Sequence, residues 1–147
     1  MMRSTPKITR VQLKVNQNIE PVIVGIVSPE PDYKLSLTLN KRLKVSMKHS
    51  KPLIIPGTKN NEILFSRFSD NSSPHGMTID LISNHNEKET LIKKLKNIDF
   101  FFRIHCAENL SDTSEMIAEI KKIESVTAVF NIENGSLKDK NANYIIQ

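Results

Sequence analysis

The chain has 147 residues, which is enough for one compact domain and too few for two of ordinary size. Its composition, 38% hydrophobic and 25% charged, is ordinary for a soluble globular protein. A single cysteine excludes an internal disulfide framework and a cysteine-rich zinc site. The formal charge of +5 makes a basic face the first feature to look for.

The charge is unevenly distributed along the chain. Residues 1–59 carry eleven Lys or Arg against three acids, a net of +8, whereas residues 60–147 carry ten against thirteen, a net of −3. Such asymmetry is found in proteins that contact nucleic acid or an acidic partner, and more often in proteins whose surface charges simply segregate.

No apolar run approaches the roughly 18 residues of a membrane helix, so no membrane association is expected. The basic start of the chain is not followed by the apolar segment of a secretory signal. Together with an unpaired Cys106, these features predict a cytoplasmic location.

The first third of the chain predicts strand, strand and helix. Residues 8–15 alternate as a half-buried strand does, and the β-branched run 22–27 indicates a central strand in which Gly25 admits another backbone. Residues 33–44 are ambiguous. Tyr33, Leu35, Leu37 and Leu39 alternate like a strand, while Leu35, Leu39 and Leu43 have helical spacing. We predict a helix here, with Asp32 as its N-cap.

The middle third predicts a hairpin. After a short strand at 45–47, residues 49–61 read as a loop because they include Pro52, Pro56 and Gly57. Residues 62–68 and 77–83 are strand-like, and the turn residues between them favour a hairpin. One or two helical turns are expected at 90–96.

The last third predicts strand, helix and strand. Residues 98–104 form the most β-prone run, and 126–132 form a final strand. Between them a helix opens at 111–113, with Glu115 placed like a capping-box acid. Its apolar stripe has 3.6-residue spacing and consists of Met116, Ile117, Ile120 and Ile123.

These elements predict an α+β fold: a mostly antiparallel sheet with two main helices on one face, for which a ferredoxin-like arrangement is one candidate. A single domain is expected over residues 7–133. Residues 1–6 and 134–147 are expected to be loosely attached, although residues 144–146 could contact a neighbouring chain.

Several short stretches carry a resemblance to a known family. They are residues 32–35, 39–41, 81–84 and 91–102. In them the chain resembles the IPExxxVDY family of small Bacteroidetes proteins, over roughly residues 15–132. Ile92 and Asp99 match the motif, and Ile98 and Phe100 replace its Val and Tyr. Lys93 and Lys94 stand where the family has Pro and Glu. The resemblance implies a single cytoplasmic domain of bacterial origin and no particular mechanism.

Asp99 is the most unusual titratable residue. It lies between Ile98 and Phe100, where an ionised carboxylate is costly unless it is paired or hydrogen-bonded. One hypothesis makes Asp99 an acid or base in a ligand site, together with Arg103. The favoured hypothesis is structural: Asp99 bonds the 90–97 turn or pairs with Arg42 or Arg103. Asp80 is expected to face solvent.

The histidines and the cysteine do not form a local catalytic or metal motif. The four histidines lack any metal-binding spacing, and neighbouring strand residues such as His105 and Cys106 point to opposite faces. No Gly-rich phosphate loop is present either. We therefore predict no catalytic set, no metal site and no cofactor.

Exposed lysines and arginines are the candidate contacts for a phosphate or for a protein partner. They are Lys34, Lys41, Arg42, Lys48 and Lys51. Phenylalanines at strand spacing resemble stacking platforms, but they are more often core residues, and the RNA-recognition pattern is absent.

Three functions follow as hypotheses. The leading one is a non-enzymatic interaction module that self-associates, as a dimer, through a sheet edge or a helix face. The alternatives are a nucleic-acid-associated protein that uses the basic first half, and a small-ligand sensor or enzyme with a pocket near Asp99.

Overall fold

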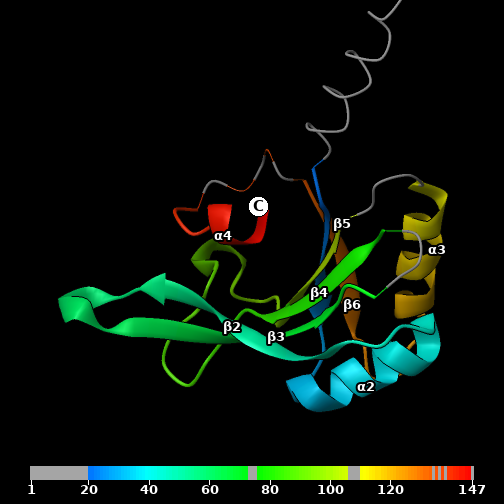
Figure 1. Cartoon of the computed structure of the whole chain (residues 1–147), viewed down its shortest axis with the longest axis horizontal. Helices are drawn as coiled ribbons and strands as arrows, with labels where there is room; N and C mark the ends of the chain where they lie inside the picture. Colours follow the sequence, from blue (N-terminus) through cyan, green and yellow to red (C-terminus); the bar gives the residue numbers. More distant parts are fainter. Residues whose placement is uncertain are drawn as a thin grey trace, which may run out of the picture.

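Figure 1 shows the computed structural model, which describes residues 20–72, 76–105 and 110–146 except 134, 136 and 138. The strand expected at 8–15 therefore lies outside the described residues. The described strands are β1 (Val22–Val27), β2 (Lys48–Pro56), β3 (Glu62–Asp70), β4 (Thr78–Ser83), β5 (Phe100–His105) and β6 (Ala128–Ile132). The helices are α2 (Asp32–Leu43), α3 (Leu110–Lys121) and α4 (Asn143–Ile146), with 3₁₀ turns η1 (Thr58–Asn60) and η2 (Lys93–Leu95).

The described strands form one sheet in the order β2-β3-β4-β5-β1-β6, and every neighbouring pair is antiparallel. The predicted α+β fold with an antiparallel sheet is therefore confirmed. The crossover through α3 encloses only β1, but the crossover through α2 encloses three strands. Because both crossovers of a ferredoxin-like sheet enclose one strand, this topology differs from the ferredoxin-like candidate.

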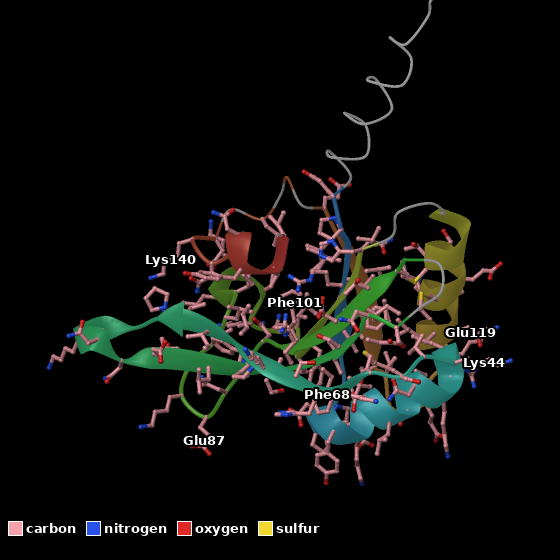
Figure 2. The ribbon with its side chains drawn as sticks, in the orientation of Figure 1. Lys44, Phe68, Glu87, Phe101, Glu119 and Lys140 are labelled. Carbon is pink, nitrogen blue, oxygen red and sulfur yellow. The ribbon has the colours of Figure 1, made fainter. Side chains whose placement is uncertain are left out.

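The sheet has an apolar core on each face, since successive strand residues point to opposite sides. Phe102 contributes to the first core, where α2 and α3 cover the sheet with Leu35, Leu39 and Ile120. Both main helices thus lie on one face, as predicted. Phe101 contributes to the second core, which residues 91–98 and α4 cover. Figure 2 labels Phe68 on the α2 side of the sheet and Phe101 on the α4 side.

Helix α2 forms because its leucines at i and i+4 face the first core, and Leu35 and Leu39 are fully buried there. The expected N-cap is displaced by one residue. Pro31 occupies the N-cap position, and Asp32 is the first helical residue. Its carboxylate accepts a bond of 2.7 Å from the Tyr33 amide and one from the Ser66 hydroxyl. An acid in the first turn also complements the helix dipole.

Strand β2 corrects the prediction of a strand at 45–47 and a loop at 49–61. Within the part of the sheet that the structure describes, β2 is an edge strand whose one partner is β3, so Pro52 costs no ladder hydrogen bond on the other side. A register shift between Ser50 and Leu53 accommodates the proline.

The sequence predicts that another backbone approaches Gly25, but the group that approaches it is the side chain of Ile98. A Cβ atom at Gly25 would lie 2.5 Å from Cδ1 of Ile98 and 3.1 Å from Cδ1 of Ile132. The missing side chain therefore lets Ile98 pack directly on β1 in the second core.

The chain end is packed on its own domain. Residues 134–147 were expected to be loosely attached, but Ala142 and Ile145 are buried, and the Asn141 side-chain amide donates to the Leu91 carbonyl at 2.8 Å. Ile145 is packed in the second core of its own chain. The apolar residues at 144–146 serve as part of the cover that this face of the sheet needs.

Asp70 connects the end of β3 to the segment between α2 and β2. Its carboxylate accepts bonds from the Ser46 amide (2.8 Å), the Ser72 amide (2.8 Å) and the Ser72 hydroxyl (2.6 Å). Burial raises the pKa of Asp70, but these hydrogen bonds outweigh burial and hold its pKa below the usual value.

We expect Asp70→Asn to be less stable than the wild type at neutral pH, because an amide offers one acceptor atom where the carboxylate offers two. A lowered folded-state pKa stabilises the fold above the unfolded pKa, and this stabilisation is lost as the pH falls through the folded pKa. Urea unfolding should be measured at neutral pH and below pH 3.8, the ordinary pKa of an aspartate. The difference in unfolding free energy between the wild type and Asp70→Asn should be smaller in acid. A stability difference that does not change with pH would contradict this role of the Asp70 carboxylate.

Candidate functional site

Arg103 pairs with Asp80 and not with Asp99. The guanidinium Nε and Nη2 donate to Oδ2 of Asp80 at 3.1 and 2.9 Å. The two residues are direct cross-strand partners on β4 and β5, and both are buried. The expectation that Asp80 faces solvent is wrong, because the sequence did not show that β4 and β5 are neighbours.

This ion pair is the centre of a larger polar network on the second face. The Ser69 hydroxyl bonds the Asp80 carboxylate, and an Arg67 nitrogen lies 3.9 Å from it. Nη1 of Arg103 donates to the carbonyls of Tyr144 (3.3 Å) and Ile145 (3.1 Å), which connects α4 to the sheet. The group therefore joins three strands and the C-terminal helix, which is a structural role.

Asp99 holds the end of β1. Its Oδ2 accepts the Ser28 amide at 2.9 Å, and its own amide donates to the Ile26 carbonyl at 3.0 Å. The structural hypothesis offers three partners for Asp99, namely the 90–97 turn, Arg42 and Arg103, and none of them is the partner that the structure shows. The Asp99 carboxylate bonds Ser28, because the chain leaving β1 passes directly beside the start of β5.

A polar hollow of about 990 Å³ lies beside Asp99, between the start of α2 and strands β3 and β4. Ser66 and Ser83 line it and share a hydrogen bond of 2.9 Å. Its lining includes four carboxyl side chains and no lysine or arginine; the carboxyl groups belong to Glu30, Asp32, Glu87 and Asp99. This surface is suited to accept hydrogen bonds and does not favour an anionic ligand.

The histidines that line this hollow have structural contacts. His49 packs edge-on against Phe68, with ring centroids 5.2 Å apart. His85 bonds the Thr90 hydroxyl at 3.1 Å and the Lys96 carbonyl at 2.9 Å. Within the described residues, no three His, Asp or Glu side chains are placed to hold a metal ion. His75 and Cys106 lie outside the described part of the chain.

The five candidate basic residues do not form one site. Lys34 and Lys41 lie exposed on α2, but Arg42 reaches across to Glu119 of α3 at 3.3 Å. Lys48 is the cross-strand partner of Ser69, so it belongs to the opposite face of the sheet from α2. Lys51 lies on the edge strand β2.

A second concave surface lies at the opposite sheet edge, and the sequence did not predict it. Among the described strands β6 pairs with β1 alone, and its Phe130 is 51% exposed. Beside it lies a groove of about 490 Å³, which we call the β6 groove. Phe130 is one of its lining residues, and the rest of its apolar lining comes from Ile92, Leu95, Ile98, Ile132 and Leu137. In the sequence, this strand differs only in having no charged residue at its centre. An uncharged strand is equally typical of the interior of a sheet, so the sequence does not indicate an open edge.

Comparisons with known proteins gave no match among family models, curated proteins or solved structures. The resemblance to the IPExxxVDY family therefore stays a prediction from the sequence. The longest described helices, α2 and α3, have 12 residues each, and no described helix is long and apolar enough to cross a membrane.

We expect Arg103→Met to destabilise the fold by about 3–5 kcal/mol, because it leaves the buried Asp80 carboxylate without its main partner. The double variant Asp80→Asn/Arg103→Met should lose less than the sum of the two single losses. Arg42→Met, which breaks an exposed pair, is the control and should lose far less. Additive losses in urea unfolding would contradict a coupled pair.

The Asp99 assignment predicts different effects of two substitutions. Asp99→Ala leaves the buried Ser28 amide without an acceptor and should cost about 1–3 kcal/mol. Asp99→Asn keeps an acceptor oxygen and should cost clearly less. Equal losses for the two variants in thermal unfolding would rule out the Ser28 bond as the role of the side chain.

Proposed function

We propose that this protein is a non-enzymatic interaction module that self-associates by pairing strand β6 of two copies. The observation that carries the proposal is that the two edges of the sheet differ in protection. An open strand edge presents unpaired backbone groups to other chains, and proteins that remain monomeric protect such edges.

Strand β2 has the protecting features and β6 does not. The β2 edge contains Pro52, a register shift after Ser50, and the exposed lysines Lys48 and Lys51. Each of these features hinders the addition of another strand. Strand β6 (AVFNI) contains no proline, glycine or charged residue and pairs with β1 in continuous register. It therefore offers a regular edge to a further strand.

The β6 groove adds apolar area to this edge. Full burial of a phenylalanine side chain contributes about 1.5–3 kcal/mol. Because Phe130 is half-exposed, covering it in an interface would contribute about half of that free energy. An aromatic residue beside an apolar groove is the usual anchor of a protein interface. Backbone pairing and burial of Phe130 would then act together.

A second copy is the occupant that best matches this edge. Antiparallel pairing of β6 about a two-fold axis would continue a sheet that is antiparallel throughout, and both copies would contribute the same surface. The rim of the groove carries both signs of charge, from Lys94, Glu133 and Asp139. Two copies therefore meet without a dominant like-charge repulsion.

The alternatives have weaker support. A nucleic-acid-associated function requires convergent cations, and Arg42 and Lys48 point away from Lys34 and Lys41. A ligand site at Asp99 would use a carboxylate that already bonds Ser28. The cytoplasmic location and the Bacteroidetes origin belong to this proposal as predictions from the sequence.

Sedimentation velocity over a concentration series tests the proposal. We expect the wild type to dimerise and Phe130→Asp to be monomeric, because a carboxylate in the apolar interface is costly. Ile54→Asp is the matched control: Ile54 lies on the β2 edge and is 47% exposed, so this variant should still dimerise. A monomeric wild type, or a dimer that only Ile54→Asp disrupts, would contradict pairing through β6.

A further inference from the structure

The outward side of helix α2 carries an apolar centre surrounded by lysines. Leu37 is 61% exposed, and Tyr33, one turn earlier, is 56% exposed. At 100° per residue, the outward residues share one side of the helix, opposite the buried Leu35 and Leu39. We call this surface the α2 outer face; it consists of Tyr33, Lys34, Leu37 and Lys41.

Packing within the domain does not explain Leu37 and Tyr33. Leu35 and Leu39 already fill the contact with the first core, and both are completely buried. Tyr33 and Leu37 gave the sequence its strand-like alternation, and in the helix that forms they are directed to solvent. Together they make an exposed apolar pair, which marks a binding surface more often than a lone exposed leucine does.

The charge around this pair has a single sign. Lys34 lies three residues before Leu37 and Lys41 four residues after it, so both are its neighbours on the helix surface. Among the described residues, no ion pair involves Lys34 or Lys41. The one acid of the helix, Asp32, lies at its start and bonds Ser66.

We propose that the α2 outer face binds an acidic segment of a partner protein that carries large apolar side chains between its carboxylates. Lys41 follows Lys34 by seven positions, which is a distance of about 10 Å along the helix axis. A partner helix with carboxylates seven residues apart and a leucine or phenylalanine between them matches this spacing. An apolar centre with a charged rim is the usual organisation of a protein interface.

Other occupants match the α2 outer face less well. A second copy would place lysines against lysines, so this surface is independent of the proposed β6 dimer. Nucleic acid would engage the lysines but leave the exposed Leu37 without a role. A lipid surface is contacted by a longer apolar stripe than two residues one turn apart.

A phage-displayed library of helical peptides, selected on the full-length protein at physiological salt, tests this proposal. We expect enrichment of sequences that combine Asp or Glu with Leu, Phe or Trp. By fluorescence anisotropy, Leu37→Ala and Lys41→Glu should each weaken the enriched peptides by about tenfold or more. Both side chains are exposed, so circular dichroism and the melting temperature should stay unchanged.

Matched controls separate this face from the rest of the surface. Leu64→Ala removes another half-exposed leucine, and Lys121→Glu reverses an exposed lysine on α3; both should bind like the wild type. Phe130→Asp should also bind normally, whether or not the protein dimerises.

Three results would overturn the proposal. They are the absence of enrichment, enrichment of neutral or basic peptides, and peptides that bind Lys41→Glu as well as the wild type. Duplex DNA or phosphatidylserine vesicles that bind more tightly than the peptides, and lose binding on Lys41→Glu, would assign the face to nucleic acid or membrane instead.

Discussion

Arg103 lies on an inner strand of the sheet and directs its guanidinium to the face that α2 and α3 leave open. There it bonds Asp80 of the neighbouring strand and two carbonyls of the C-terminal helix. A buried guanidinium is tolerated only when a charge and hydrogen-bond acceptors surround it. This requirement helps to hold α4 against the sheet, because α4 supplies two acceptors in addition to Asp80.

The cover of the second face in turn shapes the edge at β6. The chain returning from β6 to α4 contributes Leu137 and Asp139 to the β6 groove, and the turn before β5 contributes Leu95 and Ile98. Ile98 reaches this position because Gly25 has no side chain to exclude it. The segments that cover the second core thus also form the β6 groove, which is the proposed interaction surface.

Local periodicity made much of the fold predictable from the sequence. The β-branched run at 22–27 and the leucines at helical spacing in 33–44 gave β1 and α2, and adjacent residues such as Phe101 and Phe102 have to point to opposite faces of a strand. What could not be predicted depends on strand order. Asp80 meets Arg103 only because β4 and β5 are neighbours, and Pro52 is tolerated only because β2 is an edge. The β6 groove has the same origin, since the sequence does not show which strand ends the sheet.

Amide hydrogen exchange at low and high protein concentration is the sharpest test of the proposed pairing through β6. We expect the amides of β6 to exchange more slowly at high concentration, whereas those of the proline-containing edge strand β2 should exchange at the same rate at both concentrations. Exchange in β6 that does not depend on concentration, or slowing confined to β2, would contradict this pairing.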